Sequence, residues 1–109
     1  MDLVFAYITA KNFEEARKIG KHLVKERLVA CVNIIPKINS FYFWEKKMQD
    51  NNEAAIIAKT RKGKENNIIK EVKKIHSYDV PCILFIPIAG GNKEYLDWVK
   101  KEVKGKGKK

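Results

Sequence analysis

Hydrophobic residues are grouped along the chain in a pattern that alternates between strands and helices. Residues 3–8 form an apolar run that is too short for a helix and typical of a strand covered on both faces. Asn12 and Glu15 follow with the spacing of a helix N-cap and its capping-box partner. A helix to about Arg27 is predicted because the apolar positions then recur at helical spacing: Phe13, Ala16, Ile19, Leu23 and Val24.

Two longer segments with strand character come next, and polar turn residues separate the second from its return. Residues 28–35 predict a strand that resumes at 38–45, and Pro36 between them points to an edge strand or a β-bulge. The Asp-Asn-Asn sequence at 50–52 favours a turn, after which residues 53–60 predict a strand returning antiparallel. A hairpin of two long strands is therefore expected.

The last third of the sequence predicts a helix, a strand and a further helix. After Gly63 a second helix carries one apolar face: Ile68, Ile69, Val72 and Ile75. Residues 80–88 predict the fourth strand, and Asn92 caps a third helix with its own stripe: Leu96, Val99 and Val103. This β-α-β-β-α-β order with a terminal helix predicts a ferredoxin-like α+β fold. We expect one domain over residues 1–103 and a basic, flexible tail over 104–109.

The predicted hairpin is too long for a domain of this size to cover. Residues 28–48 would extend on the order of 60 Å as a continuous strand, whereas a ~100-residue domain has a radius of gyration of about 13 Å. Because successive strand residues point to opposite faces, an overhanging ribbon would be aromatic on both faces. It would then need a partner surface, so self-association is expected, with a thickened local core as the alternative. The aromatic residues are consecutive: Phe41, Tyr42, Phe43 and Trp44.

The composition indicates a basic surface and bears on the cellular compartment. The chain has 109 residues and a formal net charge of +10, and residues 100–109 hold six Lys against one Glu. This charge permits nucleic-acid binding but does not require it. Two cysteines, Cys31 and Cys82, are too few for a disulfide scaffold, which favours a reducing compartment. The N-terminal segment has neither the pattern of a signal peptide nor that of a membrane span, so the cytoplasm is expected and no membrane partner.

Three residues are candidate metal ligands. His76 ends the second predicted helix and Cys82 follows six residues later, so the two side chains could meet across the turn. Cys31 lies among apolar strand residues. An imidazole with a soft thiolate suits copper or zinc, but two ligands do not close a site and no structural zinc spacing is present. The alternatives are a capping or hydrogen-bonded histidine and cysteines that pack as small hydrophobic residues, and a site shared between subunits stays open.

Four further residues with polar tips fall at predicted strand ends or turns: Trp44, Glu45, Lys59 and Tyr78. They are candidates for a binding cleft, although tyrosine and tryptophan are also ordinary interface residues. Gly90 and Gly91 before the third helix favour a plain turn over a phosphate-binding loop. The sequence predicts no enzyme, because it contains no nucleophile motif, no credible carboxylate pair and no HExxH.

Five short motifs resemble the CutA divalent-cation tolerance protein family from about Leu3 to Val103. Each motif alone is weakly specific, but five in register are specific. They are ERLVACVN at 26–33, SFYFWE at 40–45, Lys59-Thr60, HSYDVP at 76–81, and Asn92 with Tyr95, Leu96 and Trp98. The resemblance implies a ferredoxin-like subunit, similar to the PII signalling proteins, that assembles as a homotrimer through its hairpin. Its trimer interface would include Phe41, Tyr42, Phe43 and Trp98.

The resemblance also implies tolerance to divalent metals, chiefly copper, with copper or other divalent ions bound by some members and no firmly attached catalytic activity. The sequence departs from the family where Trp-Glu-Gly-Lys becomes Trp-Glu-Lys-Lys at 44–47 and His-Pro-Tyr becomes His-Ser-Tyr at 76–78. Ile8 stands at the position of a first-strand cysteine that members with a proposed copper site use, so only His76 of that pair carries over. Cys82 replaces a frequent glutamate, and a soft thiolate there would favour Cu(I) or Zn(II).

Two functions are expected on this basis. The first is a cytoplasmic, non-enzymatic homotrimer that binds copper or another divalent metal ion, with His76, Cys82 and Cys31 as ligands. The alternative is a PII-like signalling or scaffolding trimer that binds a small metabolite or a partner protein at clefts between subunits. Those intersubunit clefts would be lined by Trp44, Glu45, Lys59 and Tyr78.

Overall fold

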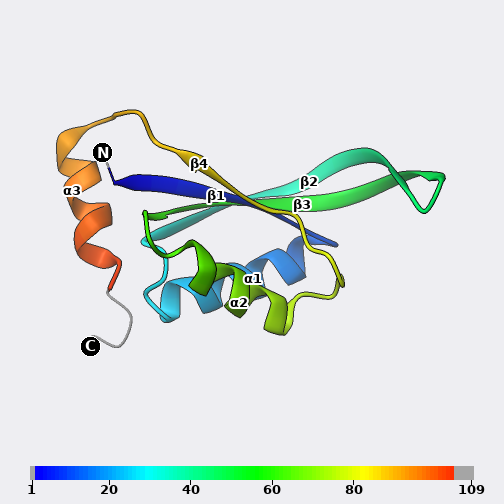
Figure 1. The fold of residues 1–109 in the computed structure, drawn as a ribbon, viewed down its shortest axis with the longest axis horizontal. Coiled ribbons are helices and arrows are strands. Elements are labelled where there is room, and N and C mark those ends of the chain that lie inside the picture. Colours follow the sequence, from blue (N-terminus) through cyan, green and yellow to red (C-terminus); the bar gives the residue numbers. More distant parts are fainter. Residues whose placement is uncertain (1, 105–109) are drawn as a thin grey trace.

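A four-stranded antiparallel sheet lies at the centre of the molecule, in a computed structural model that describes residues 2–104 (Figure 1). The strand order is β2-β3-β1-β4. The strands are β1 (Leu3–Ala10), β2 (Cys31–Trp44), β3 (Lys47–Arg61) and β4 (Ile83–Pro87). The helices are α1 (Phe13–Lys25), α2 (Glu65–Ile75) and α3 (Lys93–Glu102). This order confirms the predicted ferredoxin-like α+β architecture with a terminal helix.

The main hydrophobic core lies between the sheet and the helices α1 and α2, which cover one face (Figure 1). Every second residue of β1 points into this core, and the paired residues of the neighbouring strand β3 lie beside them on the same face of the sheet. The two rows are fully buried: Ala6, Ile8, Ala10, Ala54, Ile56 and Ala58. The helices contribute apolar residues at the predicted spacing: Ile19, Leu23, Ile68 and Val72.

Helix α1 begins with the cap that the sequence predicts, with one difference in the return bond. The side-chain oxygen of Asn12 accepts from the Glu15 N–H at 2.9 Å. The Glu15 carboxylate accepts from the Lys11 N–H at 2.9 Å, whereas a capping box would direct it to the cap residue itself. The Glu15 carboxylate also accepts a hydrogen bond from Ser77, which lies just after α2.

Helix α3 packs separately, at one end of the sheet (Figure 1). Its apolar stripe forms a second small cluster with the start of β1: Leu96, Val99, Val103, Leu3, Ala30 and Ile88. The backbone N–H of Lys104 donates to the Arg27 carbonyl at 3.1 Å. The rest of the predicted tail, residues 105–109, lies outside the described residues.

The strands β2 and β3 continue beyond the rest of the sheet as a two-stranded ribbon (Figure 1). Strand β1 pairs only with residues 54–61 of β3, so residues 47–53 pair with β2 alone. The β-bulge predicted at Pro36 is present as a register shift between Ile35 and Ile38. Phe41 is 65% exposed and Phe43 is 73% exposed. The overhanging aromatic ribbon expected from the sequence is therefore confirmed.

A two-residue turn with a constrained backbone closes the ribbon. Trp44 pairs with Lys47, and the two residues between them have positive φ, 52° at Glu45 and 69° at Lys46. Positive φ at both central residues is the type I′ geometry that matches the twist of a hairpin. A residue with a Cβ in this region costs roughly 1–2 kcal/mol, a penalty that glycine avoids.

We expect Lys46→Gly to raise the free energy of unfolding by about 0.5–1 kcal/mol, because relief of the left-handed strain outweighs the added entropy of the unfolded chain. Denaturant unfolding at matched protein concentration measures this change. The control is Lys47→Gly, which places glycine on a paired strand residue and should lower stability. A Lys46→Gly protein no more stable than the parent would contradict the turn assignment.

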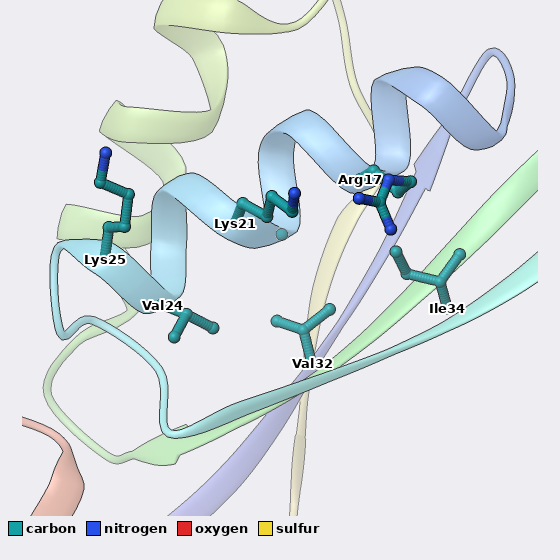
Figure 2. Close-up of a pocket in the computed structure, with 7 residues that line it drawn as sticks. Arg17, Lys21, Val24, Lys25, Val32 and Ile34 are labelled. Atoms are coloured by element: carbon teal, nitrogen blue, oxygen red, sulfur yellow. The ribbon is translucent and has the colours of Figure 1, made fainter.

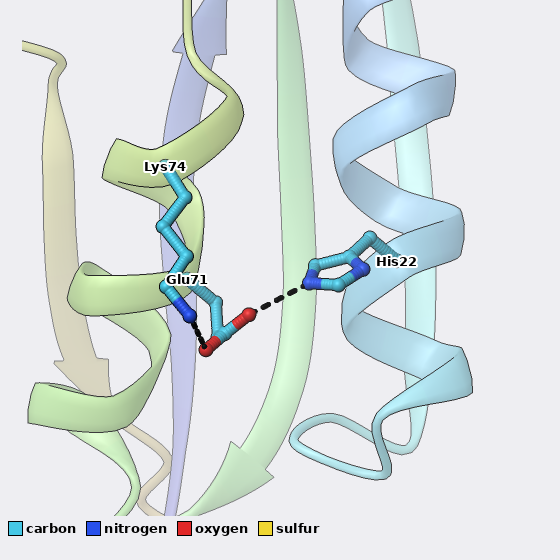
Figure 3. A network of polar contacts seen from close by, with 3 residues as sticks. All are labelled: His22, Glu71 and Lys74. Carbon is cyan, nitrogen blue, oxygen red and sulfur yellow. Dashed lines mark hydrogen bonds and ion pairs between the residues drawn. The ribbon is translucent and has the colours of Figure 1, made fainter.

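Glu71 joins the two helices that cover the sheet (Figure 3). Its Oε1 lies 2.8 Å from His22 Nε2 on α1, and its Oε2 accepts from Lys74 Nζ at 3.0 Å. The hydrogen bonds from His22 and then Lys74 hold the pKa of Glu71 below its ordinary value of 4.5. The carboxylate is therefore stabilised more in the folded than in the unfolded chain.

Glu71→Gln should lower the thermal midpoint at pH 6–7, and the deficit should shrink as the pH falls. A carboxyl group with a depressed folded-state pKa contributes stability above its ordinary pKa and loses it as the pH falls through the lower, folded-state pKa. Midpoints measured for both proteins between pH 7 and pH 3 test this. A deficit that stays constant over that range would mean that the ionised carboxylate is not the stabilising species.

Candidate functional site

His76 ties the segment that follows α2 to the end of β1. Its backbone N–H closes α2 on the Val72 carbonyl at 2.9 Å. Its ring Nε2 lies 2.8 Å from the Thr9 carbonyl oxygen, and its ring Nδ1 accepts from the Tyr78 N–H at 3.0 Å. Because a carbonyl oxygen only accepts, Nε2 carries the proton in this arrangement. Both ring nitrogens are therefore engaged, which corresponds to the hydrogen-bonded alternative among the sequence interpretations.

Glu15 fixes the next residue of the same segment. Its carboxylate accepts from the Ser77 N–H at 2.7 Å and from the Ser77 hydroxyl at 3.1 Å, in addition to the Lys11 N–H. Burial would raise the pKa of Glu15, but the hydrogen bonds from Lys11 and Ser77 outweigh it, and the pKa lies below its ordinary value. The first turn of α1 is thus joined to the loop after α2 by an ionised carboxylate.

Tyr78 connects this loop to the base of the ribbon. Its hydroxyl donates to Glu53 Oε2 on β3 at 2.8 Å, and its ring lies 4.8 Å from the His76 ring, centroid to centroid. Burial, followed by the bond to Glu53, raises the pKa of Tyr78 above its ordinary value. The phenol therefore stays protonated at neutral pH and acts as a hydrogen-bond donor to Glu53.

The two cysteines lie in different surroundings, and both are free thiols. The Cys82 carbonyl accepts from the Thr9 N–H at 3.3 Å, so Cys82 and His76 both meet the backbone of Thr9. Cys31 lies nearer the opposite end of the sheet, paired with Lys59 of β3. Lys59 Nζ approaches the Cys31 sulfur at 3.8 Å and donates to the Asn33 side chain.

These residues do not form a metal centre within a single chain. Between residues 2 and 104, no group of three or more His, Cys, Asp or Glu side chains is placed to hold a metal ion. His76 has both ring nitrogens occupied, and four residues along β3, about 13 Å of strand, separate the partner of Thr9 from the partner of Cys31. The donor set of one chain therefore does not fit a closed metal site.

The four cleft candidates are spread along the molecule. Trp44 and Glu45 lie at the tip of the ribbon, and Tyr78 lies at its base. Lys59 lies twelve residues along β3 from Lys47, which is about 40 Å of strand. One chain does not bring all four together, so a cleft lined by them requires more than one subunit.

The proposed interface residues are likewise found at two ends. The exposed aromatic residues of β2 lie on the ribbon, whereas Trp98 lies on α3, at the far end of the sheet (Figure 1). Trp98 is 41% exposed and packs on Tyr95 with ring centroids 5.6 Å apart. Burial, followed by a hydrogen bond with the Cys31 thiol, raises the pKa of Tyr95. The two aromatic groups could meet only between neighbouring subunits.

Sequence reasoning misses the partners that hold the loop after α2. Thr9 and Glu53 are 67 and 25 residues away from the side chains that they bind. The capping-box spacing identifies Glu15 only as a residue of the helix start, although it also binds Ser77 across 62 residues. No local pattern encodes such pairs, because they depend on how α2 and β1 pack.

The fold and this loop define a ferredoxin-like α+β protein with an overhanging ribbon. A family model described as CutA1 divalent ion tolerance protein matches residues 4–102, and the chain belongs to this family. The divalent-cation tolerance protein CutA of Archaeoglobus fulgidus is 50% identical over 99 residues, which cover 91% of this chain and 96% of that protein. The sequence resemblance is thereby confirmed.

A solved structure and a plant relative extend the likeness. The structure of the periplasmic divalent cation tolerance protein CutA from Archaeoglobus fulgidus has a TM-score of 0.90 at 48% identity, covering 94% of this chain and 99% of that one. The chloroplastic protein CutA 1 of Oryza sativa subsp. japonica is 41% identical over 97 residues, 89% of this chain. The match covers 55% of the rice protein, so this chain spans about half the length of that relative.

The cellular location stays a prediction. Across residues 2–104, the helices are too short or too polar to cross a membrane. The relatives just described carry the words periplasmic and chloroplastic in their names, which differ from the cytoplasm expected for this chain.

We expect His76→Ala to lower the free energy of unfolding by about 1–3 kcal/mol, because it leaves the Thr9 carbonyl and the Tyr78 N–H without their partner. Urea unfolding measures the loss. The matched control is His22→Ala, which removes an imidazole from a single contact at the surface and should cost less. If His76→Ala were as stable as the parent protein, the ring would not hold the loop.

Proposed function

We propose that the protein acts in divalent-cation tolerance as a non-enzymatic homotrimer that takes up copper or another divalent metal ion where its subunits meet. The observation that carries this proposal is the exposed aromatic ribbon in a chain of the CutA family. A ribbon of two strands is marginal in water unless another surface covers it. The function is therefore assigned to the assembly rather than to a single chain.

Burial of the ribbon supplies the driving force for assembly in this proposal. Phe41, Phe43 and Met48 are each more than 60% exposed, and fully burying one such side chain contributes about 1.5–3 kcal/mol. Leu84 and Ile86 of β4 are also exposed, on the sheet face opposite α1 and α2. Each chain thus has two apolar surfaces, and a closed ring of subunits can pair one with the other.

In this proposal the metal takes donors from more than one subunit, because residues 2–104 of a single chain do not complete a ligand set. The free thiols of Cys82 and Cys31 are the main donors in this proposal, since both ring nitrogens of His76 already make hydrogen bonds. Soft thiolates favour Cu(I) or Zn(II). His76 would join them only by giving up its bond to Thr9 or to Tyr78.

The alternative function is a PII-like signalling or scaffolding trimer that binds a small metabolite or a partner protein between subunits. The engagement of both His76 nitrogens favours it, because this histidine then orders a loop instead of binding metal. Trp44 and Glu45 at the ribbon tip would line the intersubunit cleft together with Lys59 and Tyr78 of a neighbouring subunit.

Native mass spectrometry of the metal-stripped, full-length protein under reducing conditions tests the proposal, before and after limiting copper. We expect a trimer that takes up an integral number of ions per subunit. Cys82→Ser and Cys31→Ser should each lower that number and leave the trimer intact. His76→Ala is unsuitable as the sole variant, because it also removes two structural hydrogen bonds.

The remaining outcomes separate the two functions. A trimer that stays free of metal would contradict metal uptake and favour the cleft-binding alternative. A monomer at micromolar concentration would contradict the assembly itself. Replacing both Phe41 and Phe43 by Ser should dissociate the trimer if the ribbon drives association, because both side chains are exposed in a single chain.

A further inference from the structure

A groove lies between α1 and β2, an edge strand of the described sheet (Figure 2). Its volume is about 360 Å³, within the range of sites that hold small molecules. Its apolar lining comes from Val24, Val32 and Ile34, and its polar lining comes from Arg17, Lys21 and Lys25. Every charged residue of this lining is basic.

Gly20 sets the depth of the groove. A Cβ at this position would lie 2.9 Å from Val32 Cγ1, so α1 approaches β2 as closely as it does only because residue 20 has no side chain. Val24, one turn later, keeps an exposed apolar side chain opposite Val32. The result is an apolar floor of branched side chains under the basic face of a helix.

The basic residues of the groove are spaced every four residues along α1, about 6 Å apart along the helix axis. Like charges at this spacing repel each other and destabilise a helix. Within the described residues, the ion pairs involve neither Arg17, Lys21 nor Lys25. The Arg17 guanidinium lies 5.8 Å from the centroid of the Phe13 ring, and no carboxylate neutralises it there.

The charged and apolar groups occupy different parts of the groove (Figure 2). Arg17 lies above Ile34, and the Lys21 side chain extends along the helix towards Arg17, above Val32. Val24 lies at the other end, Val32 lies between Val24 and Ile34, and the Lys25 ammonium group points away from both valines. Two neighbouring cations thus lie on the α1 side of the groove, and hydrocarbon lies below them and continues to Val24.

We propose that this groove binds an organic phosphate monoester with a short apolar chain. The phosphate lies between Arg17 and Lys21, and the chain lies on Val24 and Val32. A guanidinium group matches phosphate oxygens with two parallel hydrogen bonds, and the lysine adds a second positive charge. A phosphate monoester carries about −1.5 to −2 charges at neutral pH, which two cations balance. A carboxylate carries one charge and would leave the second cation unbalanced.

Isothermal titration calorimetry of the full-length protein with n-hexyl phosphate tests the site. Arg17→Gln and Lys21→Gln should each weaken binding by about tenfold or more, since each removes a charge-assisted hydrogen bond. Lys18→Gln is the matched control, because it removes the same charge from the same helix but from an exposed residue that does not line the groove; its affinity should stay within about twofold. The stoichiometry should be one ligand per chain.

Comparison ligands separate the head group from the chain. Hexanoate and inorganic phosphate should both bind at least about tenfold more weakly than n-hexyl phosphate, because hexanoate carries only one negative charge and inorganic phosphate has no methylene groups to bury. Val24→Ser should weaken the binding of n-hexyl phosphate and leave that of inorganic phosphate unchanged.

Several results would overturn the proposal. No binding of n-hexyl phosphate at millimolar concentration would remove the site. Equal losses in Lys21→Gln and Lys18→Gln would reduce the effect to general attraction by a basic helix. If inorganic phosphate bound as tightly as n-hexyl phosphate, the apolar side chains of the groove would not contribute to binding. If hexanoate bound as tightly as n-hexyl phosphate, the site would not be selective for phosphate.

Discussion

The pairing of β2 with β3 beyond the end of β1 is the contact on which the rest of the molecule depends. Among residues 2–104, residues 38–44 and 47–53 pair along the backbone only with each other, and most of their side chains beyond Glu53 are exposed. A ribbon of this kind is marginal in water by itself. The ribbon is joined to the rest of the molecule at its base, where Glu53 accepts a hydrogen bond from the Tyr78 hydroxyl.

The loop after α2 joins the base of the ribbon to the rest of the fold through hydrogen bonds. Three consecutive residues bind three different elements: His76 binds β1, Ser77 binds the start of α1, and Tyr78 binds β3. Because these partners are 25 to 67 residues away, the loop connects parts of the chain that local structure leaves independent. This role explains the HSY sequence without assigning it a ligand.

Local signals were enough to predict the order of the elements, but the turn predicted at residues 50–52 was wrong: these residues are paired within β3, and the turn lies at Glu45 and Lys46. Asn12 caps α1 and Pro36 marks a bulge because both effects depend on neighbouring residues alone. The predicted start of the last strand at Val80 was early, since Pro81 has no N–H and pairing with β1 begins at Ile83. The partners of His76 could not be predicted, because they depend on packing. The groove could not be predicted from the sequence either, since a row of basic residues along a helix also occurs on any solvent-exposed face.

Assembly and ligand recognition use different surfaces in this chain. The ribbon presents exposed aromatic side chains beside charges of both signs, from Glu45 and Asp50 and from Lys46 and Lys47, and β4 presents hydrocarbon, which suits another copy of the same protein. The groove beside α1 presents hydrocarbon next to two cations without carboxylate partners, which suits a small anion with an apolar part. Unbalanced charge is costly at a buried subunit contact, whereas it strengthens binding to a ligand that carries the opposite charge. The distribution of charge, more than that of apolar area, therefore separates the two surfaces.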